Sequence, residues 1–97
     1  MRARHAEGTI EMLLLVTHEV DDVEHWFNSP KRAELSEPLG ITMTPFRTPD
    51  GNGNVTAVLI ETPDMETWQA ALATDEAKQA MESDGVHPDT IKLFVAD

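Results

Sequence analysis

His18 is the first residue in this 97-residue sequence whose type and position suggest chemistry. It follows Leu14 and Val16 at a spacing of two, which places all three on one face of a strand. An imidazole removed from water on such a face titrates near neutral pH and can serve as a general acid or base. His18 is therefore the candidate catalytic residue. The alternative is that His18 is a hydrogen-bonded histidine at a strand end with no chemical role.

Trp26, Trp68 and Arg47 are the candidate ligand-binding residues. A tryptophan offers a large apolar surface and one hydrogen-bond donor to an aromatic ligand. The alternative for each tryptophan is ordinary core packing at helical spacing. Arg47 can fix a carboxylate or phenolate through its guanidinium group, or it can simply pair with surface carboxylates.

The other histidines give weaker signals. His25 lies beside an inward-facing tryptophan, so we expect it to point away from the core, and His5 falls in the N-terminal segment. His87 and Asp89 form a fragment of a metal site without a partner motif. The sequence contains no cysteine, which excludes disulfide and thiol chemistry. We expect neither a metal nor a cofactor.

The charge of the chain limits the kinds of partner that it can be expected to bind. Seven Lys and Arg residues stand against 18 Asp and Glu residues, which gives a formal net charge of -11. Such a chain repels phosphate backbones and anionic lipids, so nucleic acid and membranes are not expected partners. The longest apolar run, residues 12–16, is too short for a membrane span or a signal-peptide core. We expect a soluble cytoplasmic protein with a flexible tail at residues 1–11 and one domain at residues 12–97.

Apolar runs and turn residues predict four strands, at residues 12–20, 41–48, 55–61 and 90–96. The Gly- and Asn-rich residues 50–54 predict a hairpin turn between the second and third strands. Pro45 cannot donate a hydrogen bond to a neighbouring strand, so the second strand is expected at a sheet edge.

Two helical regions alternate with these strands. The first begins after Asp22, carries Trp26 on its inner face, and restarts with Ser29 as the cap and Pro30 as the first helical residue. It ends at Gly40. The second begins at Asp64, and its inner face carries Met65, Trp68 and Leu72; a new cap at Thr74 continues it to a stop at Gly85.

The resulting order is strand, helix, strand, strand, helix, strand. This order predicts an α+β, ferredoxin-like fold, in which an antiparallel sheet of order 4-1-3-2 carries two helices on one face. In that sheet the second strand lies at an edge, which agrees with the expectation from Pro45.

Both faces of the predicted sheet are apolar. Leu14 and Val16 oppose Leu13 and Leu15 on the first strand, and the third and fourth strands show the same pattern. Two helices can cover only one face, and soluble monomers rarely expose an apolar patch of that size. The sequence therefore predicts a homodimer that packs sheet against sheet and buries on the order of 2,000 Å². The alternative is a monomer that tolerates the patch.

Two stretches resemble the dimeric α/β-barrel superfamily, which includes antibiotic-biosynthesis monooxygenases, haem-degrading monooxygenases and small cyclases. Residues 15–26 resemble its strand-to-helix opening, with a histidine late in the strand and an aromatic residue one turn into the helix. Residues 80–88 are similar to the end of its second helix. The resemblance covers residues 12–97 and implies a dimeric barrel with a pocket between sheet and helices.

The departures from that superfamily bear on activity. Positions that hold Asn, Trp and His in haem-degrading members align with Thr17 or His18, with Thr62 and with Met81, which disfavours haem degradation. The tyrosine of quinone-forming members and the mid-helix histidine of plant-type cyclases have no counterpart here. The expected function is binding or transformation of a small apolar or aromatic compound, as a cofactor-independent monooxygenase, isomerase or cyclase. The alternative is a non-catalytic ligand-binding or interaction domain.

Overall fold

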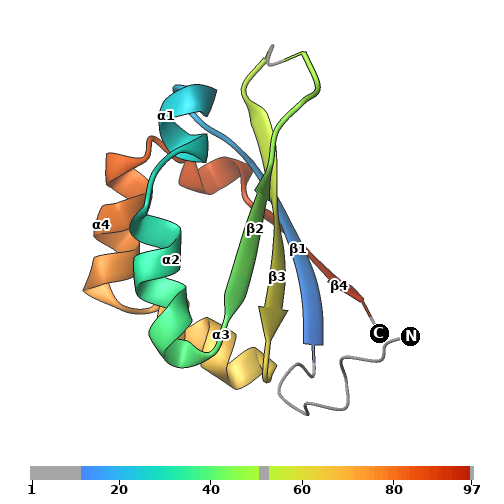
Figure 1. Ribbon diagram of the computed structural model, residues 1–97, viewed down its shortest axis with the longest axis vertical. Helices are drawn as coiled ribbons and strands as arrows, with labels where there is room; N and C mark the ends of the chain where they lie inside the picture. The colour runs from blue at the N-terminus through green and yellow to red at the C-terminus, as the bar shows by residue number, and fades with distance from the viewer. Residues whose placement is uncertain (1–11, 51–52, 97) are drawn as a thin grey trace.

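A computed structural model describes residues 12–50 and 53–96 of the chain (Figure 1). Its four strands form one antiparallel sheet in the order β2-β3-β1-β4. This is the predicted order 4-1-3-2 read from the opposite edge, so the ferredoxin-like fold is confirmed. The strands are β1 (Met12–Glu19), β2 (Thr42–Phe46), β3 (Val55–Thr62) and β4 (Lys92–Ala96).

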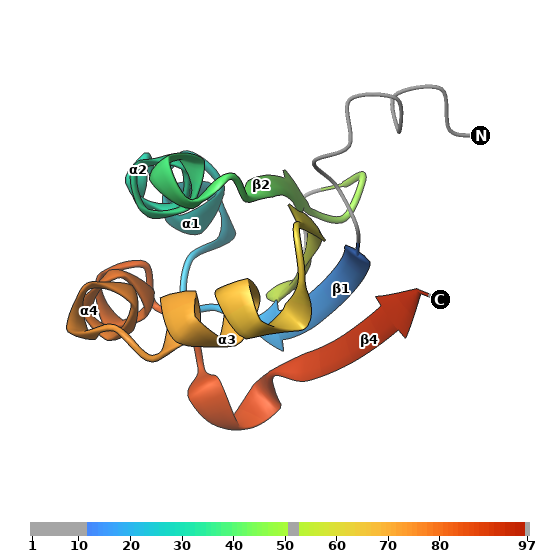
Figure 2. The same cartoon turned by 90° about the horizontal axis from the view of Figure 1, so that it is seen from below.

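Each predicted helical region consists of two short helices. The first holds α1 and α2, the second α3 and α4, and a single 3₁₀ turn follows each pair. All four helices lie on one side of the sheet (Figure 2). Their bounds are α1 (Val23–Phe27), α2 (Lys31–Ser36), α3 (Met65–Leu72) and α4 (Asp75–Ser83), with 3₁₀ turns at Glu37–Leu39 and Pro88–Thr90.

Side-chain caps begin three of the helices, as predicted. The Asp22 carboxylate accepts a hydrogen bond from the His25 backbone N–H, at 3.1 Å. Asp64 and Thr74 accept in the same way from the residues three positions later, at 2.7 and 3.1 Å. These bonds satisfy amide groups that have no partner within their helix.

The beginning of α2 differs from the prediction by one residue. Pro30, expected as the first helical residue, is the N-cap, and α2 begins at Lys31. Ser29, expected as the cap, lies one position earlier, where its hydroxyl accepts from the Lys31 N–H at 3.3 Å. The reason is that the Pro30 carbonyl accepts the first intrahelical hydrogen bond, from the Glu34 N–H at 3.2 Å.

Pro45 lies in β2, the edge strand next to β3, as its missing N–H requires. β2 is shorter than predicted, because the Ile41 N–H bonds to the Ser36 carbonyl at 3.1 Å and the pairing with β3 ends at Phe46. The antiparallel pairing of β2 with β3 confirms the hairpin. Residues 51 and 52 of its predicted turn lie outside the described residues, as does the predicted tail at residues 1–11.

The strands alternate between a helix-covered face and an open face. On the covered face, Leu14, Val16 and His18 of β1 lie opposite Ile60, Val58 and Thr56 of β3. Together with Trp26, Ile41 and Trp68, the apolar members of this face form the core.

No described element covers the other face (Figure 2). We call it the open sheet face. Its side chains are Leu13, Leu15, Thr17, Glu19, Thr42, Thr44, Phe46, Val55, Ala57, Leu59, Glu61, Lys92, Phe94 and Ala96. Several of the large apolar ones are exposed, including Phe94 at 52% of its accessible surface. None of the helices in the described part of the chain is long and apolar enough to cross a bilayer.

Candidate functional site

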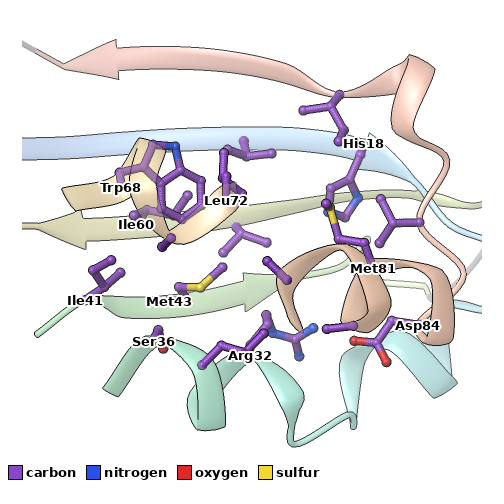
Figure 3. Close-up of a pocket in the computed structure, with 18 of the residues that line it drawn as sticks. His18, Arg32, Ser36, Ile41, Met43, Ile60, Trp68, Leu72, Met81 and Asp84 are labelled. Atoms are coloured by element: carbon purple, nitrogen blue, oxygen red, sulfur yellow. The ribbon is translucent and has the colours of Figure 1, made fainter. Parts of the chain in front are cut away.

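A cavity of about 350 Å³ lies between the covered sheet face and the helices (Figure 3). Its walls come from all four strands or their flanks and from all four helices, and most of its lining is apolar. Ile60, Trp68 and Leu72 lie toward one end of it, with Ile41 and Met43 along one side. Leu72, Ile91 and Leu93 line the cavity yet remain exposed, which indicates that it opens to solvent between α3 and β4.

The charged and titratable groups of the cavity gather at the opposite end. His18 projects from β1 and Arg32 from α2, and Asp84 is the residue that follows α4 (Figure 3). Three elements that are distant in sequence therefore bring an imidazole, a guanidinium and a carboxylate to one end of an apolar chamber. Such a chamber with a few convergent polar groups is typical of a small-molecule site.

His18 is buried and held by Thr56, its partner across the β1–β3 ladder. The Thr56 hydroxyl donates to the His18 carbonyl oxygen at 3.1 Å, and the same hydroxyl oxygen lies 2.8 Å from His18 Nδ1. Because the hydroxyl proton is used by the carbonyl, we assign the hydrogen on Nδ1, which donates to Oγ1. The lone pair of the neutral ring is then on Nε2, and no described residue donates to it.

The electrostatic surroundings favour the neutral form of His18. Burial lowers its pKa below the usual value of 6.5, and the nearby Arg32 charge adds to this effect, while a hydrogen bond to its own backbone opposes it. The ring also packs edge-on against Trp26, with centroids 5.4 Å apart and planes at 87°. At pH 7 the side chain is therefore an uncharged base.

Arg32 is held at the cavity by the break between α1 and α2. Because Pro30 has no N–H and the Lys31 N–H bonds to Ser29, the Trp26 and Phe27 carbonyls lack the amide donors four residues later, and the Trp26 carbonyl accepts instead from the Ser29 N–H, at 3.3 Å. The Arg32 guanidinium replaces them, donating at 2.9 Å and 3.0 Å. Its central carbon lies 4.5 Å from the centre of the Trp26 ring. Burial lowers the pKa of Arg32 and the Asp84 charge raises it, but a guanidinium stays protonated.

Asp84 is the least satisfied polar group of the site. Only 5% of its surface is exposed, and its Oδ1 receives no hydrogen bond from any residue that the structure describes. Its carboxylate is directed toward the Arg32 guanidinium (Figure 3), yet no ion pair joins these two side chains. A buried carboxylate oxygen without a partner is rare and calls for an explanation.

Three of the four site residues predicted from the sequence line the cavity, and Arg47 does not. His18, Trp26 and Trp68 all line the cavity, and all three are buried. Arg47 is not among the lining residues: it follows β2, with its guanidinium carbon 4.3 Å from the centre of the Phe27 ring and its Nη1 3.8 Å from the Glu24 carboxylate.

The remaining histidines make local contacts away from the cavity. His25 Nε2 lies 3.0 Å from the Ser83 carbonyl oxygen and joins α1 to the end of α4. His87 pairs with the Asp21 carboxylate, and this hydrogen bond raises the pKa of His87. The described residues contain no group of three or more His, Asp or Glu side chains placed to hold a metal ion. His5 lies outside the described residues.

Arg32, Asp84 and Ser36 were not selected as site residues from the sequence, although all three line the cavity. A signal for Arg32 did exist, because the predicted break at Pro30 leaves carbonyl groups for a nearby basic side chain to satisfy. Asp84 precedes the predicted stop at Gly85, but a helix end gives no sign that its carboxylate is buried. We find no sequence signal for Ser36.

Comparison with known proteins defines the fold. No protein-family model and no curated protein sequence matches the chain. Among solved structures, an antibiotic biosynthesis monooxygenase is similar over 90% of this chain and 97% of its own, with a TM-score of 0.63 and 15% identity.

Two further structures are similar. A Deinococcus radiodurans protein provisionally named an antibiotic biosynthesis monooxygenase matches over 90% of this chain and 91% of its own, with a TM-score of 0.58 and 10% identity. A conserved protein of unknown function from Bacteroides thetaiotaomicron matches over 91% and 95%, with a TM-score of 0.56 and 14% identity. These likenesses establish the architecture of the chain.

Proposed function

We propose that this protein binds a small apolar organic compound, aromatic in character, in the cavity between the sheet and the helices. The observation that carries the proposal is the cavity itself, about 350 Å³ of largely apolar space. The core of a small protein is ordinarily packed without large voids, because empty space removes contacts between neighbouring side chains. A chamber retained beside two tryptophans is therefore best explained by an occupant.

The structural neighbours support the same proposal, because two of them carry the name of an enzyme type that acts on organic compounds. The lining supplies apolar contact through Trp68, Ile60 and Met43, whereas the charged groups stand at one end only. An elongated ligand with one polar end fits this distribution.

A cavity-filling substitution tests the proposal. Ala80 lines the cavity from α4, and Ala80→Phe is expected to fill part of it. We expect 1-methylnaphthalene to raise the melting temperature of the wild type and to have at least tenfold weaker affinity for Ala80→Phe. Ala73→Phe is the matched control, because Ala73 is exposed and does not line the cavity. The absence of any shift in the wild type would contradict the proposal.

The second candidate function is catalysis by proton transfer in the same cavity. The observation that supports it is the position and protonation of His18. Removal of a proton from the substrate is the first step of many isomerase, cyclase and cofactor-independent oxygenase reactions. A neutral imidazole that lines an apolar chamber and keeps the lone pair on Nε2 can accept that proton.

The protonation state of His18 is the measurable requirement for this role. In a nitrogen-15 NMR titration we expect His18 to titrate below pH 6.5 with its hydrogen on Nδ1, and His87 to titrate above pH 6.5. Because the unfolded chain binds a proton at His18 more readily than the folded protein does, the contribution of His18 to the free energy of unfolding should decrease as the pH falls through 6.5 and below. The His87 contribution has the opposite sign, present below pH 6.5 and lost as the pH rises through its raised pKa. A His18 pKa at or above 6.5 would contradict the neutral, desolvated imidazole on which this candidate function depends.

The open sheet face supports a further part of the proposal, that the working form is a homodimer. The face crosses all four strands and has no described cover. Its large apolar side chains include Leu13, Leu15, Phe46, Val55 and Phe94. A second copy placed by a two-fold axis would cover this face with the same face of its partner and so satisfy both at once.

A further inference from the structure

Arg32 alone would predict a site for organic acids, because a guanidinium in an apolar pocket pairs well with a carboxylate. Asp84 changes that expectation. Its carboxylate faces the guanidinium at the same end of the cavity, so the local formal charge is close to zero. An incoming carboxylate would gain the attraction of Arg32 but would also meet the repulsion of Asp84 in a poorly hydrated space.

The hydrogen-bonding capacity of Arg32 and Asp84 also disfavours a carboxylate ligand. Two donor groups of Arg32 are already committed to the Trp26 and Phe27 carbonyls. Asp84 Oδ1, by contrast, is a buried acceptor without a donor among the described residues. The strongest unmet demand at this end of the cavity is therefore for a hydrogen-bond donor, and a deprotonated acid has none to give.

We propose that Asp84 is the specificity-determining residue of the cavity, and that it selects an uncharged ligand with a hydroxyl donor and rejects organic acids. The inference rests on the proposed function, because it concerns a ligand of the same cavity. Because Oδ1 is shielded from solvent in the unliganded cavity, ligand binding turns the Asp84 side chain so that its carboxylate accepts from the ligand hydroxyl, while the apolar body of the ligand extends toward Trp68. A cationic amine would gain the attraction of Asp84 but would also meet the repulsion of Arg32 in the same poorly hydrated space.

Three naphthalene derivatives separate the contributions. 1-Methylnaphthalene measures the apolar cavity alone, 1-naphthol adds an uncharged hydroxyl, and 1-naphthoate adds a carboxylate. At pH 7 a phenol-type hydroxyl keeps its proton and a carboxylic acid has lost it. Using calorimetry on the wild type, we expect 1-naphthol to bind about tenfold more tightly than 1-methylnaphthalene, the size of effect typical of a hydrogen bond to a charged group. We expect 1-naphthoate to bind most weakly of the three.

Asp84→Asn removes the negative charge and keeps the shape of the side chain. We expect it to weaken 1-naphthol binding by about tenfold and to strengthen 1-naphthoate binding by at least tenfold, which reverses the ranking. Asp89→Asn is the matched control, because Asp89 is exposed and does not line the cavity, and it should retain the wild-type ranking. If Asp84→Asn does not fold, a wild type that binds naphthoate more tightly than naphthol would still overturn the proposal.

The outcomes separate this inference from the proposal on which it rests. Failure of all three compounds to bind the wild type would overturn both. Binding of 1-methylnaphthalene without a preference for 1-naphthol would leave the cavity as a ligand site and overturn the role of Asp84; a crystal structure in which water alone satisfies Oδ1 would accompany that result. Wild-type preference for 1-naphthoate would also overturn it.

Discussion

Leu15→Lys is expected to convert the protein from a dimer to a monomer. Leu15 lies in β1, an interior strand, and it pairs with Leu59 of β3 and Phe94 of β4 in the middle of the open sheet face. A two-fold axis through this face would bring both copies of Leu15 into the interface. One substitution would then bury two ammonium groups without partners, which costs several kcal/mol per ion. Light scattering coupled to size-exclusion chromatography would report the change as a halved mass.

The monomeric variant should remain folded. Leu15 is 37% exposed within a single copy, so a lysine there reaches solvent and leaves the covered face and the core unchanged. We expect its far-ultraviolet circular dichroism to match the wild type. Its melting temperature should be lower and independent of protein concentration, whereas the melting temperature of a dimer rises with concentration.

Leu39→Lys provides the matched control. Leu39 is 44% exposed, close to the value for Leu15, but it belongs to the 3₁₀ turn after α2 and not to the sheet. This variant should keep the dimeric mass. A wild type that already elutes with the mass of one chain would refute the dimer, and a dimeric Leu15→Lys variant would move the interface away from the open face.

The fold was predictable because independent local rules agreed on it. Asp22, Asp64 and Thr74 fix three helix beginnings through caps that involve residues only three positions away. Pro45 specifies an edge strand for a reason that needs no knowledge of the rest of the sheet. When local preferences and global topology point to one arrangement, the arrangement can be derived from the sequence.

The site was predictable only in part. His18, Trp26 and Trp68 were found because strand and helix periodicity place them on inward faces. Arg32 and Asp84 come together through the packing of α2 against the end of α4, and no spacing within the sequence encodes that contact. Whether a charged residue is solvated or buried depends on such tertiary packing, and 18 acidic residues offered no reason to choose one.

Trp26→Ala is expected to have the largest effect on stability. Trp26 is 2% exposed and is among the largest fully buried side chains. Its ring contacts His18 edge-on and lies beneath the Arg32 guanidinium, so its removal leaves a void next to two polar groups. Truncation of a buried aromatic residue costs about 3–5 kcal/mol. Urea denaturation should show this loss, which approaches the total stability of a small domain.

Trp26→Phe separates the structural role of this residue from its influence on the site. The smaller ring fills much of the same volume, so we expect most of the stability to remain. It shields the imidazole less, however, and a better hydrated His18 should titrate closer to 6.5 than in the wild type. Trp68→Phe is the matched control, because Trp68 lies toward the opposite end of the cavity and has no ring contact with His18. If Trp68→Phe moved the His18 pKa as far as Trp26→Phe, burial by Trp26 would not be the cause of the lowered value. An unchanged His18 pKa in Trp26→Phe would lead to the same conclusion, and the imidazole would then owe its neutrality to the sheet and to Arg32.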